Sequence, residues 1–139
     1  PPQAKAGDCK ACHGTQKVLS EGPPDTAAMA WEACGACHRE GKMKLAGKIP
    51  GSHIHQLRGV TCVKCHGTAK KQAALTMDQC IACHGSPDKL AEKTAKVKPS
   101  NPHTSPHYGT TLDCNFCHKQ HAKSENFCAQ CHKFDFKTP

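Results

Sequence analysis

The sequence has very few large apolar side chains. Leucine, isoleucine, valine and phenylalanine together make up only 17 of 139 residues, and there is a single tryptophan and a single tyrosine. This share of about 12% lies below the roughly 20% under which a composition favours disorder. Side chains alone therefore cannot fill a core for a domain of this length. Either the chain is disordered, or a bound group supplies its apolar interior.

Long apolar runs are also missing. No stretch approaches the roughly 18 consecutive apolar residues that a membrane-spanning helix needs. We therefore expect a chain that does not cross a membrane. Its first residues, Pro-Pro-Gln-Ala, do not have the pattern of a signal peptide, and we interpret them as the start of a mature chain after removal of an export signal.

Cysteine, in contrast, is abundant and regularly placed. All 12 cysteines occur in Cys-x-x-Cys pairs, and each of the six pairs is followed directly by histidine. With 11 histidines in 139 residues, chance would place one after a given pair about 8% of the time, so six of six is not coincidence. The motifs, numbered in chain order, are Cys9, Cys12 and His13; Cys34, Cys37 and His38; Cys62, Cys65 and His66; Cys80, Cys83 and His84; Cys114, Cys117 and His118; and Cys128, Cys131 and His132.

Cys-x-x-Cys-His is the attachment signature of c-type haem. Two thiols three positions apart on one helical turn lie on the same side and can bond to the two vinyl-derived carbons at one porphyrin edge. The adjacent histidine can then supply the proximal nitrogen to the iron. We predict six haem c groups, with the twelve cysteines as tethers and the six motif histidines as proximal ligands. About 23 residues per haem cannot separate six porphyrins, so we expect them to be closely packed.

Other uses of Cys-x-x-Cys explain the pattern less well. Zinc would combine four ligands from two motifs and gives no reason for a histidine after every pair. A thioredoxin-like dithiol normally occurs once, in a βαβ context that is missing here. Local disulfides would close loops too short to stabilise the fold appreciably.

Five histidines lie outside the motifs: His53, His55, His103, His107 and His121. His55 and His107 each stand seven residues before the first cysteine of a motif, and His53 and His103 lie slightly further upstream. This repetition predicts that all five are distal iron ligands. His53 and His55 are only two residues apart, and we expect their side chains to point in different directions.

Six irons and five spare histidines leave one iron with a different sixth ligand. Met29 and Met43 flank motif 2 and could supply a thioether, whereas Met77 is expected to pack on its own haem. Water, a lysine, the terminal amine and a ligand from another subunit remain open. No histidine precedes Cys9, so we expect the unusual haem in the N-terminal half.

The motif spacing predicts one hexahaem domain over residues 1–139, with diheme units at about 1–44, 45–90 and 91–139. We expect mostly coil with short α-helices and little or no β-structure, because the haems would organise the fold. Helices are predicted over 26–37, from the capping-box pattern of 76–79 into motif 4, and over 88–96 after Ser86 and Pro87. The proline-containing stretches 21–24 and 98–106 are expected to be surface turns.

From His53 to His132 the sequence resembles the small tetrahaem cytochromes c and the tetrahaem domain of flavocytochrome c fumarate reductases. The shared features are a histidine before a first Cys-x-x-Cys-His, a second such motif followed by Gly85, the Pro-His103-Thr-Ser-Pro-His107 element, and His121 after motif 5. The resemblance implies bis-histidine haems, electron transfer, and distal roles for His55 or His53, His103, His107 and His121. The additional N-terminal diheme unit departs from the family, and the missing flavin domain means that fumarate reduction is not implied.

The formal charge of +8 would ordinarily suggest nucleic acid as a partner. Twelve haem propionates would bring the holoprotein close to neutral, and no aromatic residues alternate with the basic ones as in a nucleic-acid surface. We therefore expect redox proteins or extracellular electron acceptors as partners, and no nucleic acid.

The sequence predicts an electron-transfer protein of anaerobic or extracellular respiration, not an enzyme, exported to the periplasm or the cell exterior. One alternative is a subunit of a conductive cytochrome filament, a homo-oligomer in which neighbouring copies exchange ligands. Another is a small reductase that uses one haem with an open coordination position.

Overall fold

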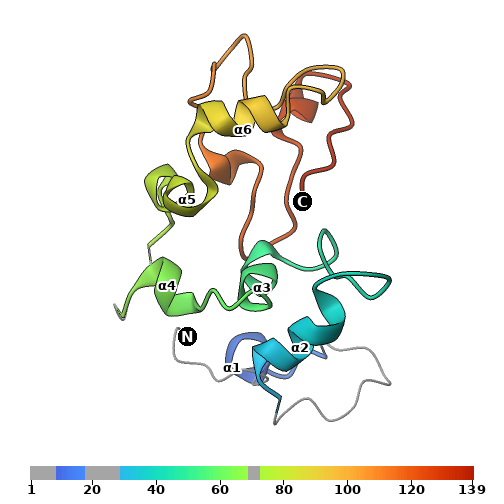
Figure 1. The fold of residues 1–139 in the computed structure, drawn as a ribbon, viewed down its shortest axis with the longest axis vertical. Helices are drawn as coiled ribbons and strands as arrows, with labels where there is room; N and C mark the ends of the chain where they lie inside the picture. Colours follow the sequence, from blue (N-terminus) through green and yellow to red (C-terminus); the bar gives the residue numbers. More distant parts are fainter. Residues whose placement is uncertain (1–8, 18–28, 69–72) are drawn as a thin grey trace. The chain divides into compact units, whose positions relative to one another are not determined.

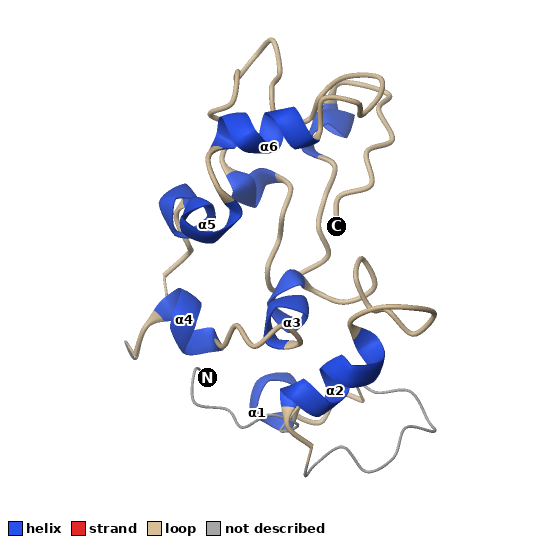
Figure 2. Cartoon of the chain, viewed as in Figure 1, coloured by secondary structure: helices blue, strands red, loops and turns tan. Residues whose placement is uncertain are grey.

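The computed structural model describes residues 9–17, 29–68 and 73–139 as short helices joined by long loops (Figures 1 and 2). The chain divides into two compact units, Pro1–Gln72 and Ala73–Pro139, called here the N-terminal and C-terminal units. The N-terminal unit contains α1 (Lys10–His13), α2 (Trp31–His38), α3 (Gly51–Gln56) and α4 (Cys62–His66). The C-terminal unit contains α5 (Met77–His84), α6 (Pro87–Lys93) and the 3₁₀ helices η1 (Cys114–Phe116) and η2 (Phe127–Gln130).

The prediction of short helices and coil is confirmed. No strand occurs in the described residues, and an isolated antiparallel bridge joins Ser105 and Gly109. None of the helices described has the length and apolarity that crossing a bilayer requires. The predicted three diheme units concern haem ligands, and the division at Gln72 and Ala73 does not test them.

Every motif lies on a single helical turn, and four of these turns stop at the motif histidine. In motifs 1, 3 and 4 the next residue is a glycine with positive φ: Gly14 at 61°, Gly67 at 66° and Gly85 at 85°. Residues with a side chain rarely adopt a positive φ, so glycine permits the helix to end there. Motifs 5 and 6 form the tighter η1 and η2, in which the motif histidine N–H still donates to the carbonyl of the first cysteine, at 2.8 and 2.9 Å. The turn predicted for haem attachment is therefore present in all six motifs.

The helix starts were predicted better than the helix ends. Thr76 and Gln79 form the expected capping box of α5, and the Ser86 side chain accepts a hydrogen bond from the Lys89 N–H at the start of α6. However, α6 ends at Lys93 and not at Lys96, because the backbone leaves the helical conformation at Thr94, whose hydroxyl contacts Asn101 and His103 beyond the helix.

The two remaining local predictions fall partly outside the described residues. The helix expected over 26–37 begins at Trp31, after extended backbone at Ala30, while residues 26–28 are not described. The turn at 21–24 is likewise outside the described range. Residues 98–106 do form turns, but several of their side chains are half-buried, so this stretch is not simply a surface loop.

The side-chain core is minimal, as the composition predicts. Among the described residues, the buried hydrophobic side chains are Leu57, 3% exposed, in the N-terminal unit and Ala91, 9% exposed, in the C-terminal unit. Larger apolar groups such as Phe116 and Tyr108 are 47% and 46% exposed. Among the described residues, each unit therefore has one buried hydrophobic side chain in place of the continuous core that other proteins of this size have.

The contact at Leu57 joins α2 to the end of α3. Gly35 is buried there, and a Cβ at this position would lie 2.8 Å from the Leu57 carbonyl oxygen. Arg39 spans the same junction and donates a hydrogen bond to that oxygen at 3.0 Å. The absence of a side chain at Gly35 thus lets motif 2 approach the segment that carries His53 and His55.

Replacing Leu57 with alanine should destabilise the protein by about 2–4 kcal/mol, because it removes the one large buried side chain described in the N-terminal unit. Guanidinium unfolding followed by circular dichroism measures the change. Val63→Ala, at a side chain that is 40% exposed, is the control and should cost less than about 1 kcal/mol. Equal effects of the two substitutions would contradict the assignment of Leu57 as a core residue.

Candidate functional site

Three motif histidines each face a histidine from outside the motifs. The ring centroids of His13 and His53 are 6.0 Å apart, with 42° between the ring planes. His118 and His103 are 6.2 Å apart and nearly parallel, at 2°. His132 and His107 are 5.9 Å apart, at 32°. Each pair combines one predicted proximal ligand with one predicted distal ligand.

The spacing of these rings fits one metal ion held between two imidazoles. A metal–imidazole bond is about 2.0 Å long, and C–N bonds of about 1.33 Å place a ring nitrogen about 1.1 Å from the ring centre. Two imidazoles on opposite sides of one ion should therefore have centroids about 6.3 Å apart. Rings in face-to-face contact would lie at about 3.5–4.0 Å. The donor sets of these three pairs thus match an axially ligated haem iron, whose remaining four ligands come from the porphyrin.

Helix α3 directs its two histidines to different sides. Successive residues of an α-helix are about 100° apart, so positions 53 and 55 differ by about 200°. His53 faces His13, and the Nδ1 of His55 forms a 2.8 Å hydrogen bond with the Gly51 carbonyl, one turn earlier. The expectation that the two side chains point apart agrees with this arrangement.

The turns that follow α6 carry the other two histidines of the observed pairs. His103 is half-buried and His107 is exposed. Burial lowers the pKa of His103, and burial together with the neighbouring His103 lowers the pKa of His118. A lowered pKa favours the neutral imidazole, which is the form that binds a metal. His121, exposed, lies three residues after His118 and is in none of the three pairs above.

Motif 2 has a different environment. The ring of His38 faces no second histidine within the described part of the chain, which includes all 11 histidines. Its Nδ1 instead lies 2.9 Å from the backbone carbonyl oxygen of Met43. If Nε2 bound a metal, Nδ1 would carry the proton and donate it to this oxygen. The Met43 backbone would then lie on the side of His38 that faces away from the metal.

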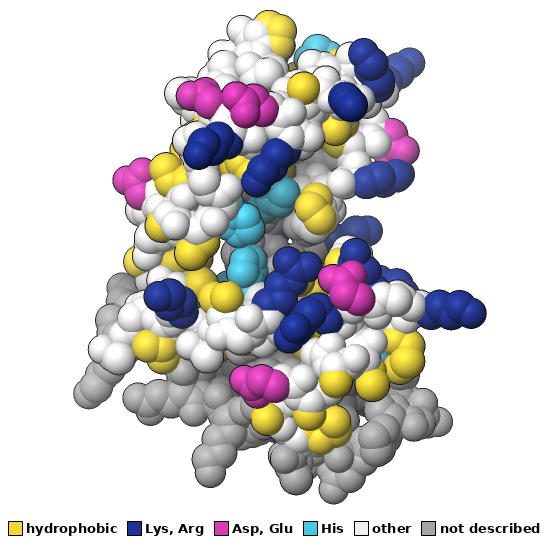
Figure 3. Space-filling model, viewed as in Figure 1, with side chains coloured by type: hydrophobic (Ala, Val, Ile, Leu, Met, Phe, Trp, Pro, Cys, Tyr) yellow, Lys and Arg dark blue, Asp and Glu magenta, His cyan; other side chains and the backbone are white. Residues whose placement is uncertain are grey.

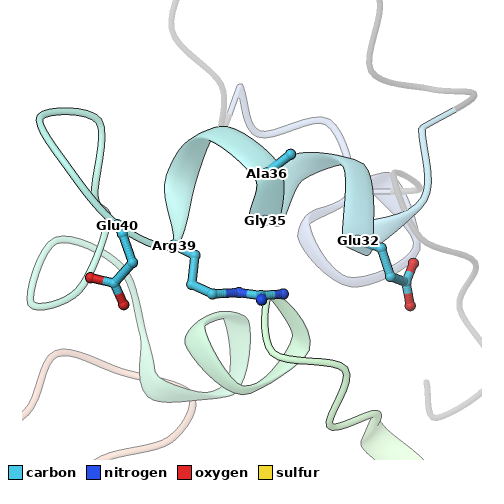
Figure 4. Close-up of a pocket in the computed structure, with 5 residues that line it drawn as sticks. All are labelled: Glu32, Gly35, Ala36, Arg39 and Glu40. Atoms are coloured by element: carbon cyan, nitrogen blue, oxygen red, sulfur yellow. The ribbon is translucent and has the colours of Figure 1, made fainter.

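The outer surface of α2 contains a shallow depression next to motif 2 (Figure 4). It is lined by Glu32, Gly35, Ala36, Arg39 and Glu40. In Figure 4 the Arg39 side chain extends along the helix toward the junction with α3, with the two carboxylates on either side of it. The guanidinium is already used by the Leu57 carbonyl, so this depression forms part of the α2–α3 contact.

The described cysteines are arranged neither as disulfides nor as a zinc site. None of the eleven cysteines whose side chains are described forms a disulfide. In the described residues, no three or more cysteine, histidine or acidic side chains converge on one point, as four-coordinate zinc requires. Burial raises the pKa of the Cys114 and Cys128 thiols, whereas zinc binding favours thiolates. Cysteine pairs on helical turns, without a disulfide between them, are the arrangement that thioether attachment needs.

Several residues that position the motifs were not identified from the sequence. The Asn115 side chain donates to the Leu75 carbonyl at 2.8 Å and connects motif 5 to the start of α5. The Asn126 side chain donates to the Phe134 carbonyl at 2.6 Å and holds the segment after motif 6. The Phe134 ring stacks on His132 with centroids 4.6 Å apart and planes 8° apart. These contacts join residues up to 40 positions apart, and no local pattern in the sequence signals them.

A comparison with protein families identifies the family of this chain. The cytochrome c3 family model matches residues 54–133, more than half of the chain. The chain belongs to the cytochrome c3 family. Proteins of this family are multihaem electron carriers that bind haem c. Searches of curated proteins and of solved structures each found no match.

The family match covers some of the candidate ligands of this cytochrome c3 family member and leaves out others. It includes motifs 3 to 6 together with His55, His103, His107 and His121. It leaves out motifs 1 and 2, and it starts one residue after His53. The pair of His13 and His53 therefore belongs to an N-terminal extension that the family model does not describe.

Replacing His53 with alanine should remove one axial ligand and produce one more iron that binds carbon monoxide than in the unaltered protein. The carbon monoxide difference spectrum, quantified per haem, measures this change. Arg58→Ala, at an exposed position two residues after α3, is the control and should leave the spectrum unchanged. An unchanged spectrum for H53A would contradict the pairing of His53 with His13.

Proposed function

We propose that this protein is a hexahaem c-type cytochrome that carries single electrons in anaerobic or extracellular respiration. Each of the six motifs binds one haem c covalently through its two cysteines, and its histidine binds the iron of that haem. When bound, haem c supplies reversible one-electron chemistry at its iron. The family membership supports electron transfer, and the six motifs support the number of haems.

One observation carries the proposal: three motif histidines face three non-motif histidines at 5.9–6.2 Å. In each of these three pairs one motif histidine faces one histidine from outside the motifs, as the two axial positions of one haem iron require. We assign His53, His103 and His107 as distal ligands to motifs 1, 5 and 6. His55 and His121 then serve the irons of motifs 3 and 4. Bis-histidine ligation gives lower potentials than histidine–methionine ligation, which suits reactions under anaerobic conditions.

The chain's own residues hold and orient the ligands. Hydrogen bonds at Nδ1 hold the rings of His38, His55 and His103, as is usual for an imidazole that binds metal through Nε2. Lowered pKa values keep His103 and His118 neutral. The short helical turns present both cysteines of a motif on one side, so that attachment needs no further rearrangement of the backbone.

The charge of the chain suits haem propionates and transient partners. Lysine and arginine exceed the acidic residues by 19 to 11, and Figure 3 shows basic side chains spread over the visible face with few acidic ones. Several histidines are also visible at this surface. We propose that the lysines balance the propionates and that redox partners bind weakly and briefly, as suits a carrier. Because haem c is attached outside the cytoplasm, we place the protein in the periplasm or at the cell exterior.

The intact mass of the purified protein should exceed that of the polypeptide by six haem groups, and its pyridine haemochrome should give the same number. Replacing both cysteines of motif 1, Cys9 and Cys12, with serine should lower the count by one. The same change at Cys80 and Cys83 in motif 4 is the matched variant within the family region. A colourless protein with free or zinc-bound thiols would disprove the proposed function.

We assign the iron without a histidine partner to motif 2. His38 faces no other histidine in the described chain, and Met43 is held on its far side by the hydrogen bond from Nδ1. A porphyrin bound by His38 would stand between the Met43 side chain and the distal position. Met43 is therefore not the sixth ligand, and of the remaining candidates we propose water, which leaves this iron accessible to a small molecule.

Carbon monoxide should accordingly bind one iron in six in the unaltered protein, and Met43→Ala should bind the same amount. Removing the side chain leaves the carbonyl that holds His38 in place. Titration of the dithionite-reduced protein gives the stoichiometry. Carbon monoxide binding that appears only in M43A would identify Met43 as a ligand and overturn this assignment.

A further inference from the structure

The ring of His103 is held by a network of side chains at the end of α6. Its Nδ1 lies 3.0 Å from the Thr94 hydroxyl, and its backbone N–H donates to the Asn101 side-chain carbonyl at 3.0 Å. The Asn101 amide donates to the Ala91 carbonyl at 2.7 Å. The network thus ends at Ala91, the buried side chain of this unit.

The direction of each hydrogen bond follows from the chemistry of the groups. An imidazole that binds metal through Nε2 carries its proton on Nδ1, so His103 donates to the Thr94 oxygen. Thr94 has one proton, and its acceptors are the Asn101 carbonyl at 2.7 Å and the Leu90 carbonyl at 2.9 Å. The Asn101 amide cannot be reversed, because its NH₂ faces the Ala91 carbonyl and its oxygen faces two donors.

The geometry of the opposed rings correlates with this network. His103 and His118 have ring planes only 2° apart. The planes of the other two pairs differ by 42° and 32°. In the pair of His13 and His53, the Nδ1 of the distal histidine lies 3.3 Å from the hydroxyl of the adjacent Ser52.

We infer that Thr94 and Asn101 are positioning residues, which hold the imidazole plane of His103 parallel to that of His118 and give the iron of motif 5 its own spectroscopic signature and potential. This inference rests on the proposed haem ligation.

Ring orientation matters because each imidazole has a filled π orbital perpendicular to its plane. Two parallel rings interact with the same iron d orbital and separate it in energy from its partner orbital, whereas rings at a large angle interact with both. Parallel rings therefore give a well-resolved rhombic low-spin EPR signal, and a growing angle moves the low-field feature to higher g. The Nδ1 hydrogen bond also makes the ligand more basic and stabilises ferric iron.

The test compares Thr94→Val with Thr94→Ser in the complete holoprotein. Valine has the shape of threonine without the hydroxyl, and serine keeps the hydroxyl. Thr111→Val is the matched control, because the Thr111 hydroxyl donates to the Tyr108 carbonyl at 2.8 Å in an exposed turn. EPR of the oxidised protein and a redox titration are measured for each variant.

In T94V, the low-field EPR feature of the iron with nearly parallel imidazoles should move to higher g. This iron accounts for one-sixth of the total. One of the six reduction potentials should also rise. T94S and T111V should retain the signals of the unaltered protein. A T94V spectrum and titration identical to those of the unaltered protein would overturn the inference, and so would an equal change in T111V. A normal haem count in these samples shows that such a failure concerns the network and not the proposed function.

A second measurement does not depend on a variant that folds. In the reduced protein with carbon monoxide bound at the motif 2 iron, so that every iron is diamagnetic, the Nδ1 proton of His103 should give an NMR signal that exchanges slowly with solvent and shows a nuclear Overhauser effect to the Thr94 methyl group. A rapidly exchanging proton, or one without this contact, would contradict the hydrogen bond on which the inference depends.

Discussion

The separation that two imidazoles must keep around one iron is the constraint on which the proposed holoprotein depends. The observed pairs connect positions 13 and 53, 103 and 118, and 107 and 132, so each pair closes a long loop. Ordering such loops costs conformational entropy that normally is offset by apolar burial. Here Leu57 and Ala91 are the buried hydrophobic side chains among the described residues. Axial ligation and the burial of porphyrin would have to supply the stabilising free energy that buried side chains supply in other proteins.

The same constraint explains why α3 is central to the N-terminal unit. Its two histidines lie on different faces, so one short helix can contribute to two metal centres. His55 falls within the cytochrome c3 family match and His53 lies immediately before it. In the proposed ligation, His53 would connect the residues before the family match to the helix that carries His55. The buried Gly35 brings motif 2 to the end of this helix, because any larger residue would meet the Leu57 carbonyl.

Covalent motifs and helix starts could be predicted from the sequence because both are local. The six Cys-x-x-Cys-His turns, the capping box of Thr76 and Gln79, and the Ser86 cap each involve residues within four positions of one another. The pairing of rings could not be predicted, since it joins residues 15 to 40 positions apart through coil that has no periodic pattern. The early end of α6 has the same origin: Thr94 forms hydrogen bonds with Asn101 and His103, which the local sequence of the helix does not reveal.

Motif 2 shows that a count of candidate side chains does not identify the sixth ligand of a particular iron. The sequence identifies Met43 as a thioether candidate, whereas its backbone carbonyl accepts the hydrogen bond from His38. The shortage of non-motif histidines does not depend on the oligomeric state of the chain. Identical copies that exchange histidines still contain five non-motif histidines for every six motifs, so a filament or a dimer of this chain has the same deficit per copy. If all six motifs bind haem, one iron per copy therefore lacks a histidine as its sixth ligand, whatever the oligomeric state.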